Sequence, residues 1–535
     1  MNDGIFPKTN RQEGYLNDHD RILLEENGIE LAKNSVDSIY ESQFNLYRTL
    51  TIPEEKLFLS YCSSDKEGAS IRPSIMIKKL KRIFPNLTEH SDIVSKQYAI
   101  TNEKSTFEEA LQVYQQYLEG NEMDEKWKEL LLYFYHTKKK EFSRAISGMN
   151  YTNKAEKISL QNIRKMYGTN LKTTISRLEN YRRCPFSFHM TYGLKLKEND
   201  NFQMTTIDTG SFMHEVIDCF FKQVEENNLD LKSISEEEIQ KIVGKIIDEI
   251  LQTSRYYIFS SSAKFRMMTR RLKKVVLQSM NYIIYSLKYS DFKPIGHEVE
   301  FANNSPYKPI KLQLNSGENI EIIGKIDRVD VGKLNDKEYV RIIDYKSQVK
   351  RLDLNQVVSG LQIQLITYLD AITEQDHFEP AGVLYLGLVD HIVKANKNLS
   401  EDEIEKEIRK GFKMQGLILA DVQVIKMMDN KLEQGYSDIV PAYVGKDGIS
   451  SKLSSVANKE EFEGLQKEIR KTIQKISSQI LQGNIDIKPY FYQKKTGCDY
   501  CKYKSICMFD PNRKGNEYDY IRHKNNQDIL NDISK

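Results

Sequence analysis

The segments IIGKIDRVDVG (322–332) and EYVRIIDYKS (338–347) decide the fold of this chain. Both are rich in Ile, Val and Tyr, which favour β-strands, and a turn that contains Asn separates them. Side chains two apart on a strand lie on one face, about 6–7 Å apart, so Asp344 and Lys346 are predicted to be neighbours. Asp327 belongs to the adjacent strand. The sequence therefore predicts two carboxylates and a lysine on neighbouring strands of one sheet.

Predicted helices and strands alternate around these two segments. Further strands are predicted at 294–302 and 381–389, with a helix at 361–372 between the last two strands. Apolar residues recur at helical spacing in DTGSFMHEVIDCFF (208–221). Three further helices are predicted to open with capping boxes, in which Ser and a Glu three residues later satisfy the first N–H groups, at Ser176, Ser235 and Ser400. The alternation predicts an α/β fold.

Residues 1–160 read as a separate region of helices and short strands. A helix is predicted at 106–120, and KLFLSY (56–61) is predicted to be a buried strand that ends at a core residue, Cys62. The polar, basic stretch 150–170 separates this region from a domain predicted at 171–515, and residues 516–535 are predicted to be a polar tail.

Composition and charge exclude several classes of protein. The chain has 535 residues, and Lys+Arg 78 against Asp+Glu 76 gives a net charge of +2, so any DNA-binding surface must be regional. Six cysteines are too few for a secreted disulfide scaffold, and MNDGIFPKTN lacks a signal-peptide pattern. No apolar run approaches the roughly 18–20 residues that span a bilayer. A cytoplasmic protein without a membrane partner is expected.

One basic stretch breaks the global neutrality. Residues 251–290 contain Arg270, Arg271 and further lysines and arginines, but no Asp or Glu. Such a stretch suits phosphate contacts, and it equally suits a solvated helix face or one that docks an acidic partner.

Four short motifs follow one another in an order that is more specific than any of them alone. They are Gly210 to His214, Gly324 to Asp327, Asp344 to Lys346, and Gln364 to Tyr368. Two carboxylates, a backbone carbonyl and an imidazole suit a hard cation such as magnesium or manganese. A lysine beside such ligands stabilises developing charge. The order predicts a metal-dependent hydrolytic site.

Three cysteines close to the C-terminus form a second constellation. Cys498, Cys501 and Cys507 lie within ten residues, and Cys184 is the candidate fourth ligand. Thiolates favour zinc or an iron-sulfur cluster over magnesium, and the spacing leaves both open. Joining Cys184 to the trio would close a loop of roughly 300 residues, so a structural clasp is expected.

Together these motifs resemble the RecB-like branch of the PD-(D/E)XK nucleases, and more closely the AddB-type nuclease domains. The resemblance covers residues 171–515 and rests on TISRLENYRRCPF (174–186) and the motifs above. It implies a restriction-endonuclease-like core with a mixed sheet flanked by helices. It also implies the site roles: a magnesium shell, a catalytic lysine and residues that hold DNA or brace the site, namely His214, Asp327, Asp344 and the Tyr345 carbonyl, then Lys346, then Gln364 and Tyr368. Glu298 matches a further acidic position, for which Glu300 competes.

The resemblance also implies a 4Fe-4S cluster on Cys184, Cys498, Cys501 and Cys507, cleavage of the 5'-ended strand, and an AddA-type helicase-nuclease partner in double-strand break repair. Residues 1–160 resemble the last part of a UvrD-like helicase region, and no phosphate loop of the form Gly-x4-Gly-Lys-Ser/Thr occurs, so no ATPase site is expected. We expect the C-terminal portion of a longer protein. The alternatives are a stand-alone Cas-associated RecB-like nuclease and a non-catalytic scaffold that threads DNA.

Overall fold

The computed structural model describes residues 1–6, 16–29, 31, 35–65, 68–91, 100–197, 205–391, 393, 400–512 and 515–534. Contacts between residues divide the chain into two compact units, Met1–Met149 and Asn150–Lys535, each of which has its own core. None of the described helices is both long enough and apolar enough to cross a membrane.

The described part of the first unit is helical. Its small core lies between α4 and α5, where Ala110, Trp127 and Phe134 are buried. The helix predicted at 106–120 is confirmed as part of α4. The helices of this unit are α1 (Asp18–Glu26), α2 (Ser35–Thr51), α3 (Ile75–Ile83), α4 (Glu103–Leu118), α5 (Glu125–Thr137) and α6 (Lys139–Met149).

The buried strand predicted at 56–61 is not formed. These residues pair with no strand in the described part of the chain, Phe58 is 88% exposed, and Cys62 is exposed as well. An apolar segment becomes a buried strand only when neighbouring strands satisfy its backbone and cover its side chains. The described residues of this unit provide no such sheet.

The second unit is built on a six-stranded mixed sheet in the order β12-β8-β7-β6-β5-β2. The strands β2, β5 and β6 form the predicted antiparallel meander, whereas β7 returns parallel to β6 after a helical crossover. The expected α/β fold is therefore confirmed. The six strands are β2 (Lys293–Phe301), β5 (Gly324–Leu334), β6 (Lys337–Lys346), β7 (Glu379–Gly387), β8 (Gln415–Leu419) and β12 (Val456–Ala457).

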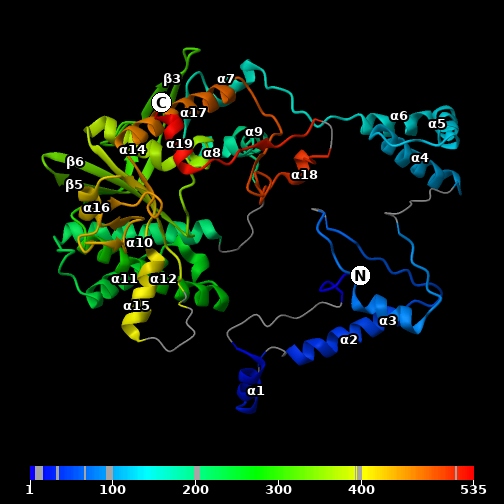
Figure 1. Ribbon diagram of the computed structural model, residues 1–535, viewed down its shortest axis with the longest axis horizontal. Coiled ribbons are helices and arrows are strands. Elements are labelled where there is room, and N and C mark those ends of the chain that lie inside the picture. The colour runs from blue at the N-terminus through cyan, green and yellow to red at the C-terminus, as the bar shows by residue number, and fades with distance from the viewer. Residues whose placement is uncertain are drawn as a thin grey trace. The chain divides into compact units, whose positions relative to one another are not determined.

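Helices cover both faces of this sheet (Figure 1). One apolar core joins one face to α10 (Thr206–Glu226), α11 (Glu236–Leu251) and α12 (Ala263–Lys288). The other core joins the opposite face to α8 (Ile175–Arg183), α14 (Gln364–Asp376) and α17 (Lys459–Leu481). The remaining helices are α7 (Leu160–Tyr167), α9 (Pro185–Phe188), η1 (His189–Gly193), η2 (Ser254–Phe259), α13 (Leu354–Val358), α15 (Glu401–Phe412), α16 (Val422–Met428) and α18 (Lys504–Cys507).

Two of the three predicted capping boxes are formed. Ser235 and Ser400 each cap their helix together with the Glu three residues later. The box predicted at Ser176 is wrong, because Thr174 caps α8 through its side chain. The carboxylate of Glu179 is consequently free to serve another helix, as described below.

Three small sheets complete the unit, and the last of them includes residues predicted to be a tail. The strand orders are β1-β4-β3, β11-β10-β9 and β14-β13-β15. Residues 516–535 supply β15 and α19, whose Ile529 and Leu530 are buried against the core that contains α17. The strands are β1 (Leu171–Thr173), β3 (Ile310–Gln313), β4 (Asn319–Ile322), β9 (Gly435–Tyr436), β10 (Tyr443–Gly445), β11 (Gly448–Ile449), β13 (Tyr490–Tyr492), β14 (Lys495–Thr496) and β15 (Asp519–Tyr520), and the helix is α19 (Asn526–Ile533).

Candidate active site

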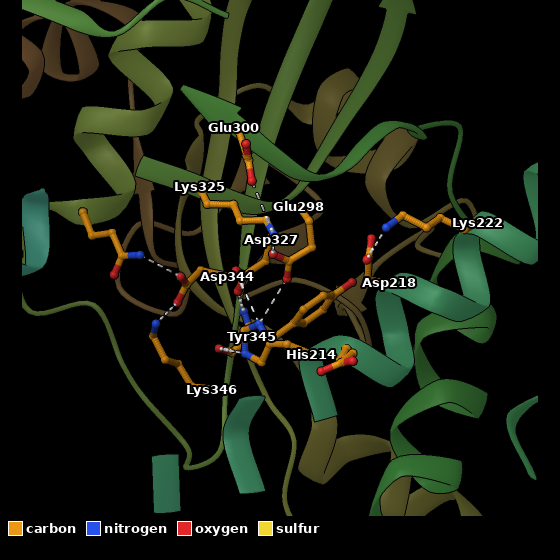
Figure 2. A network of polar contacts seen from close by, with 12 residues as sticks. His214, Asp218, Lys222, Glu298, Glu300, Lys325, Asp327, Asp344, Tyr345 and Lys346 are labelled. Atoms are coloured by element: carbon orange, nitrogen blue, oxygen red, sulfur yellow. Dashed lines mark hydrogen bonds and ion pairs between the residues drawn. The ribbon is translucent and has the colours of Figure 1, made fainter. Parts of the chain in front are cut away.

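The carboxylates of the candidate site come from three adjacent strands of the large sheet (Figure 2). Arg328 of β5 pairs with Ile343 of β6, so Asp327 and Asp344 occupy the next position along the two strands. The Tyr345 N–H donates a hydrogen bond to Asp327 Oδ2 at 2.7 Å, which ties the end of β6 to that carboxylate. The strand register thus brings together the two aspartates predicted from the sequence.

Glu298 supplies the third carboxylate. It lies on β2 between His297 and Val299, whose partners on β5 flank Asp327. Its φ of 50° is in the left-handed region, which costs energy for a residue with a side chain and is typical of functional sites. Glu300, which competed with Glu298 for this position, is 58% exposed at its side chain and reaches only Lys325, at 3.9 Å.

His214 of α10 completes a tight group with two of these carboxylates. Its Nδ1 atom lies 3.6 Å from Glu298 Oε1 and 3.5 Å from Asp327 Oδ1, and its Nε2 atom lies 3.1 Å from the Tyr345 carbonyl oxygen. One ligand atom from each of His214, Glu298 and Asp327 falls within 4.8 Å of the others. Imidazole and carboxylate oxygens within that distance suit a divalent cation.

The charges around His214 keep its ring protonated in the metal-free protein. Burial alone would lower the pKa of His214, but the ion pairs with Asp327 and Glu298 outweigh it and raise the pKa to about 10. The imidazolium therefore stands in for a cation among the carboxylates. A metal ion that bound here would displace that proton.

Asp344 is held by a different set of partners. Its Oδ2 atom pairs with Lys346 Nζ at 2.5 Å, and its Oδ1 atom accepts a hydrogen bond from Gln364 Nε2 at 3.1 Å. Burial and the nearby charge of Asp327 raise the pKa of Asp344 to about 6, although Lys346 opposes them. Asp344 thus lies within electrostatic reach of the group formed by His214, Glu298 and Asp327 but is not part of it.

The helix α14 presents Gln364 and Tyr368 to this site, as their four-residue spacing predicted. Burial raises the pKa of Tyr368, and the charge of Asp344 raises it further, so the two side chains are close. A Cβ atom at Gly324 would lie 2.8 Å from the Tyr368 hydroxyl, so glycine permits the close approach of helix and strand here. Both side chains therefore brace the site.

A cavity of about 570 Å³ opens at the tight group. Its walls combine the carboxylates with cations that sequence analysis did not single out. Lys325 pairs with Glu298 at 2.7 Å; it is two residues before Asp327 on β5, and that spacing was the available signal. The lining residues are Gly210, Ser211, His214, Glu215, Asp218, Cys219, Lys222, Arg255, Glu298, Lys325 and Asp327.

The predicted basic stretch lies largely on α12. Arg270 and Arg271 are both exposed, and Arg271 Nε pairs with Asp390 Oδ2 at 3.2 Å. Arg255 of the same stretch lines the cavity and pairs with Glu215 at 3.0 Å. The stretch therefore reaches the candidate site through Arg255.

The four predicted cysteine ligands come close together. Burial raises the pKa of Cys184 to about 11 and that of Cys498 to about 12, and neighbouring thiols raise both values further. A Cβ atom at Gly497 would lie 2.4 Å from the Arg183 carbonyl oxygen, so glycine allows the two cysteine-bearing segments to touch. No three of the four sulfurs, all of which are described, have their atoms within 4.8 Å of one another.

Comparison with known proteins agrees with this architecture. The family model for the PD-(D/E)XK nuclease superfamily matches residues 172–508. The chain is 40% identical to the B subunit of the ATP-dependent helicase/deoxyribonuclease of Clostridium novyi (strain NT), over 99% of this chain and 48% of that protein. The protein of the same name from Thermoanaerobacter sp. (strain X514) is 36% identical over 100% of this chain and 48% of its own length.

The chain spans about half the length of the curated relatives that it matches. The resemblance to AddB-type proteins is thereby confirmed, since relatives so named match nearly the whole chain. The mixed sheet, its flanking helices and the matched residues lead to one assignment: this chain belongs to the PD-(D/E)XK nuclease superfamily.

Proposed function

We propose that this chain hydrolyses DNA phosphodiester bonds as a magnesium-dependent exonuclease, acting on the 5'-ended strand as part of a helicase-nuclease complex. The observation that carries the proposal is the group of His214, Glu298 and Asp327 beside the Asp344–Lys346 pair. The relatives are named as subunits of an ATP-dependent helicase/deoxyribonuclease, which supports an AddA-type partner and a role in double-strand break repair.

The donor set fits magnesium. His214, Glu298 and Asp327 would hold the ion, with Asp344 and the Tyr345 carbonyl at hand to complete its shell. When bound, the ion polarises a phosphoryl oxygen and lowers the pKa of a coordinated water. Hard carboxylate oxygens favour magnesium or manganese over softer metals.

Lys346 contributes a positive charge rather than a base. Burial would lower the pKa of Lys346, but the adjacent Asp344 carboxylate outweighs burial and raises it. A permanently charged ammonium 2.5 Å from Asp344 is suited to stabilise the negative charge that develops on phosphate during hydrolysis. Arg270 and Arg271 are proposed to contact the DNA backbone, because exposed cations on one helix suit phosphates.

The central experiment is cleavage of single-stranded DNA labelled at either end, with Mg²⁺ or with a chelator. We expect Mg²⁺-dependent cleavage that falls at least about a hundredfold in Asp344→Ala and in Lys346→Ala, because each removes a charge needed in the transition state. Release of the 5' label in short products tests the polarity. Undiminished cleavage in either variant would refute the site assignment, and binding without any cleavage would favour the scaffold.

Two glutamates on one strand form a matched pair for the metal group. Glu298→Gln removes a carboxylate that lies 3.6 Å from His214, whereas Glu300→Gln alters an exposed neighbour two residues away. We expect the first variant to need about tenfold more Mg²⁺ or higher, and the second to behave as the wild type. Equal effects in the two variants would contradict the role of Glu298.

We further propose that Cys184, Cys498, Cys501 and Cys507 hold a 4Fe-4S cluster as a structural clasp. A tetrahedral zinc ion, with Zn–S bonds of about 2.3 Å, would place its sulfurs about 3.8 Å apart. The wider separation of these thiols favours a larger group. The pKa values of Cys184 and Cys498, raised first by burial and then by neighbouring thiols, indicate that thiolates here need a compensating cation.

Colour and metal content test the clasp. Protein purified without oxygen should be brown, with broad visible absorbance and about four irons per chain, and Cys498→Ala should lose both. Cys62→Ala is the matched control, because Cys62 is exposed and lies in the other unit. A colourless protein with one zinc per chain would overturn the cluster.

A further inference from the structure

The first turn of α14 depends on a carboxylate from another helix. The residue before this helix, Ile363, provides no side-chain cap. Instead, Glu179 Oε1 of α8 accepts the N–H groups of Ile363 at 2.9 Å and Gln364 at 3.2 Å. These two N–H groups are among those that a helix start leaves without partners, and a carboxylate there also complements the helix dipole.

That first turn carries the side chain that holds Asp344. The backbone N–H of Gln364 is bound by Glu179, while its side-chain amide donates to Asp344 Oδ1 at 3.1 Å. Glu179 and Asp344 are therefore joined through a single residue. A shift of the helix start would move the Gln364 amide away from the carboxylate that it holds.

The surroundings of Glu179 suit an ionised carboxylate despite its burial. Burial raises the pKa of Glu179, but Lys350, the two N–H groups and Arg183 all act against that increase. Lys350 itself is anchored, since its ammonium lies 4.6 Å from the centre of the Tyr385 ring. Glu179 is thus a buried, charged group with a defined set of partners, which lie outside the metal group.

We propose that Glu179 is a positioning residue of the active site, which seats the start of α14 so that Gln364 holds Asp344 in place for metal binding. This proposal rests on the function proposed above. It assigns to a residue of the sequence TISRLENYRRCPF a role that its own helix does not require, since Thr174 caps α8.

A double-mutant cycle on the Mg²⁺ requirement tests the proposal. Glu179→Gln keeps the shape but loses the charge, and Gln364→Ala removes the amide that reaches Asp344. We expect each single variant to raise the Mg²⁺ concentration for half-maximal cleavage about tenfold, as for one hydrogen bond to a charged group. If Glu179 acts through Gln364, the double variant should resemble Gln364→Ala alone. Effects that multiply to about a hundredfold would overturn the proposal.

Asp370→Asn is the matched control for damage to the helix. Asp370 lies on α14 six residues after Gln364 and pairs with Arg470 of α17 at 2.6 Å, away from Asp344. We expect this variant to melt at a lower temperature with an unchanged Mg²⁺ requirement. An equal rise in the Mg²⁺ requirement would show that any weakening of α14 suffices and would overturn the proposal.

Two further measurements separate this proposal from the proposed function. Mn²⁺ binding followed by calorimetry reads the same cycle without cleavage, so a wild type that binds Mn²⁺ but cleaves no DNA would refute only the proposed function. Glu179→Asp keeps the charge on a shorter side chain and serves if Glu179→Gln does not fold; a smaller rise in the Mn²⁺ dissociation constant is expected. Wild-type Mn²⁺ binding in every folded Glu179 variant would refute the positioning role.

Discussion

His297 and Glu298 are neighbours in the chain with opposite surroundings. The Glu298 side chain reaches the cavity, whereas the His297 ring stacks on Phe221, with ring centres 3.7 Å apart and planes 12° apart. Both ring nitrogens of His297 are buried without a hydrogen-bond partner among the described residues. Burial, and next the charge of Arg328, lower the pKa of His297 to about 3.

The depressed pKa of His297 predicts a loss of stability in mild acid. An unfolded chain takes up a proton on this ring below pH 6.5, while the folded chain does not until about pH 3, so stability falls as the pH decreases through that window. His297→Phe should keep the stacking and reduce the loss between pH 7 and pH 5 by about 2 kcal/mol. Urea unfolding at both pH values measures this, and an unchanged pH dependence would contradict it.

At the scale of elements, the contact between β5 and α14 holds the site together. Gly324 begins β5, and a Cβ atom there would press on the buried Tyr368 ring, 2.8 Å from its hydroxyl. Gly324→Ala should therefore displace the helix face that carries Gln364, and lower cleavage about tenfold or more, because small misplacements in active sites are costly. Initial rates at saturating Mg²⁺ measure this effect.

Gly244→Ala is the control for that substitution. Gly244 lies in α11, where a Cβ atom would meet no other atom within 4 Å. Alanine there should raise the free energy of unfolding by about 0.5–1 kcal/mol, because glycine weakens a helix, and leave cleavage unchanged. If Gly244→Ala impaired cleavage as Gly324→Ala does, contact with Tyr368 would not be the cause.

At the scale of the molecule, every candidate site residue belongs to the unit that begins at Asn150. The first residues of this unit clamp the cysteine region. Asn153 Nδ2 donates to the Cys507 carbonyl at 2.5 Å, and the Ile158 N–H donates to the Gly483 carbonyl at 3.0 Å. The described cores of the two units share no residue.

Two shortened chains test this division. Residues 150–535 should retain Mg²⁺-dependent cleavage and the visible absorbance of the clasp. Residues 160–535 lack Asn153 and Ile158 and should be less stable by about 1–3 kcal/mol, because a buried carbonyl loses its donor. Thermal melting and absorbance compare the two. Loss of cleavage in the longer chain would show that the site needs the first unit.

The sequence by itself determined the α/β class, the strands around 322–347 and the helices that open at Ser235 and Ser400. These features depend on side-chain periodicity and on hydrogen bonds between residues close in the chain, which one sequence displays directly. The buried strand at 56–61 was mispredicted because strand formation also needs partners that are distant in the chain.

Only the tertiary structure decided which carboxylates meet. The strand register selects Glu298 over Glu300 beside Asp327, and packing of α8 against α14 gives Glu179 to a helix other than its own. Such choices depend on contacts between segments far apart in the chain, whose alignment is set by the packing of whole elements. A shift of one residue in that register would turn Glu298 away from the site, and no local pattern reports it.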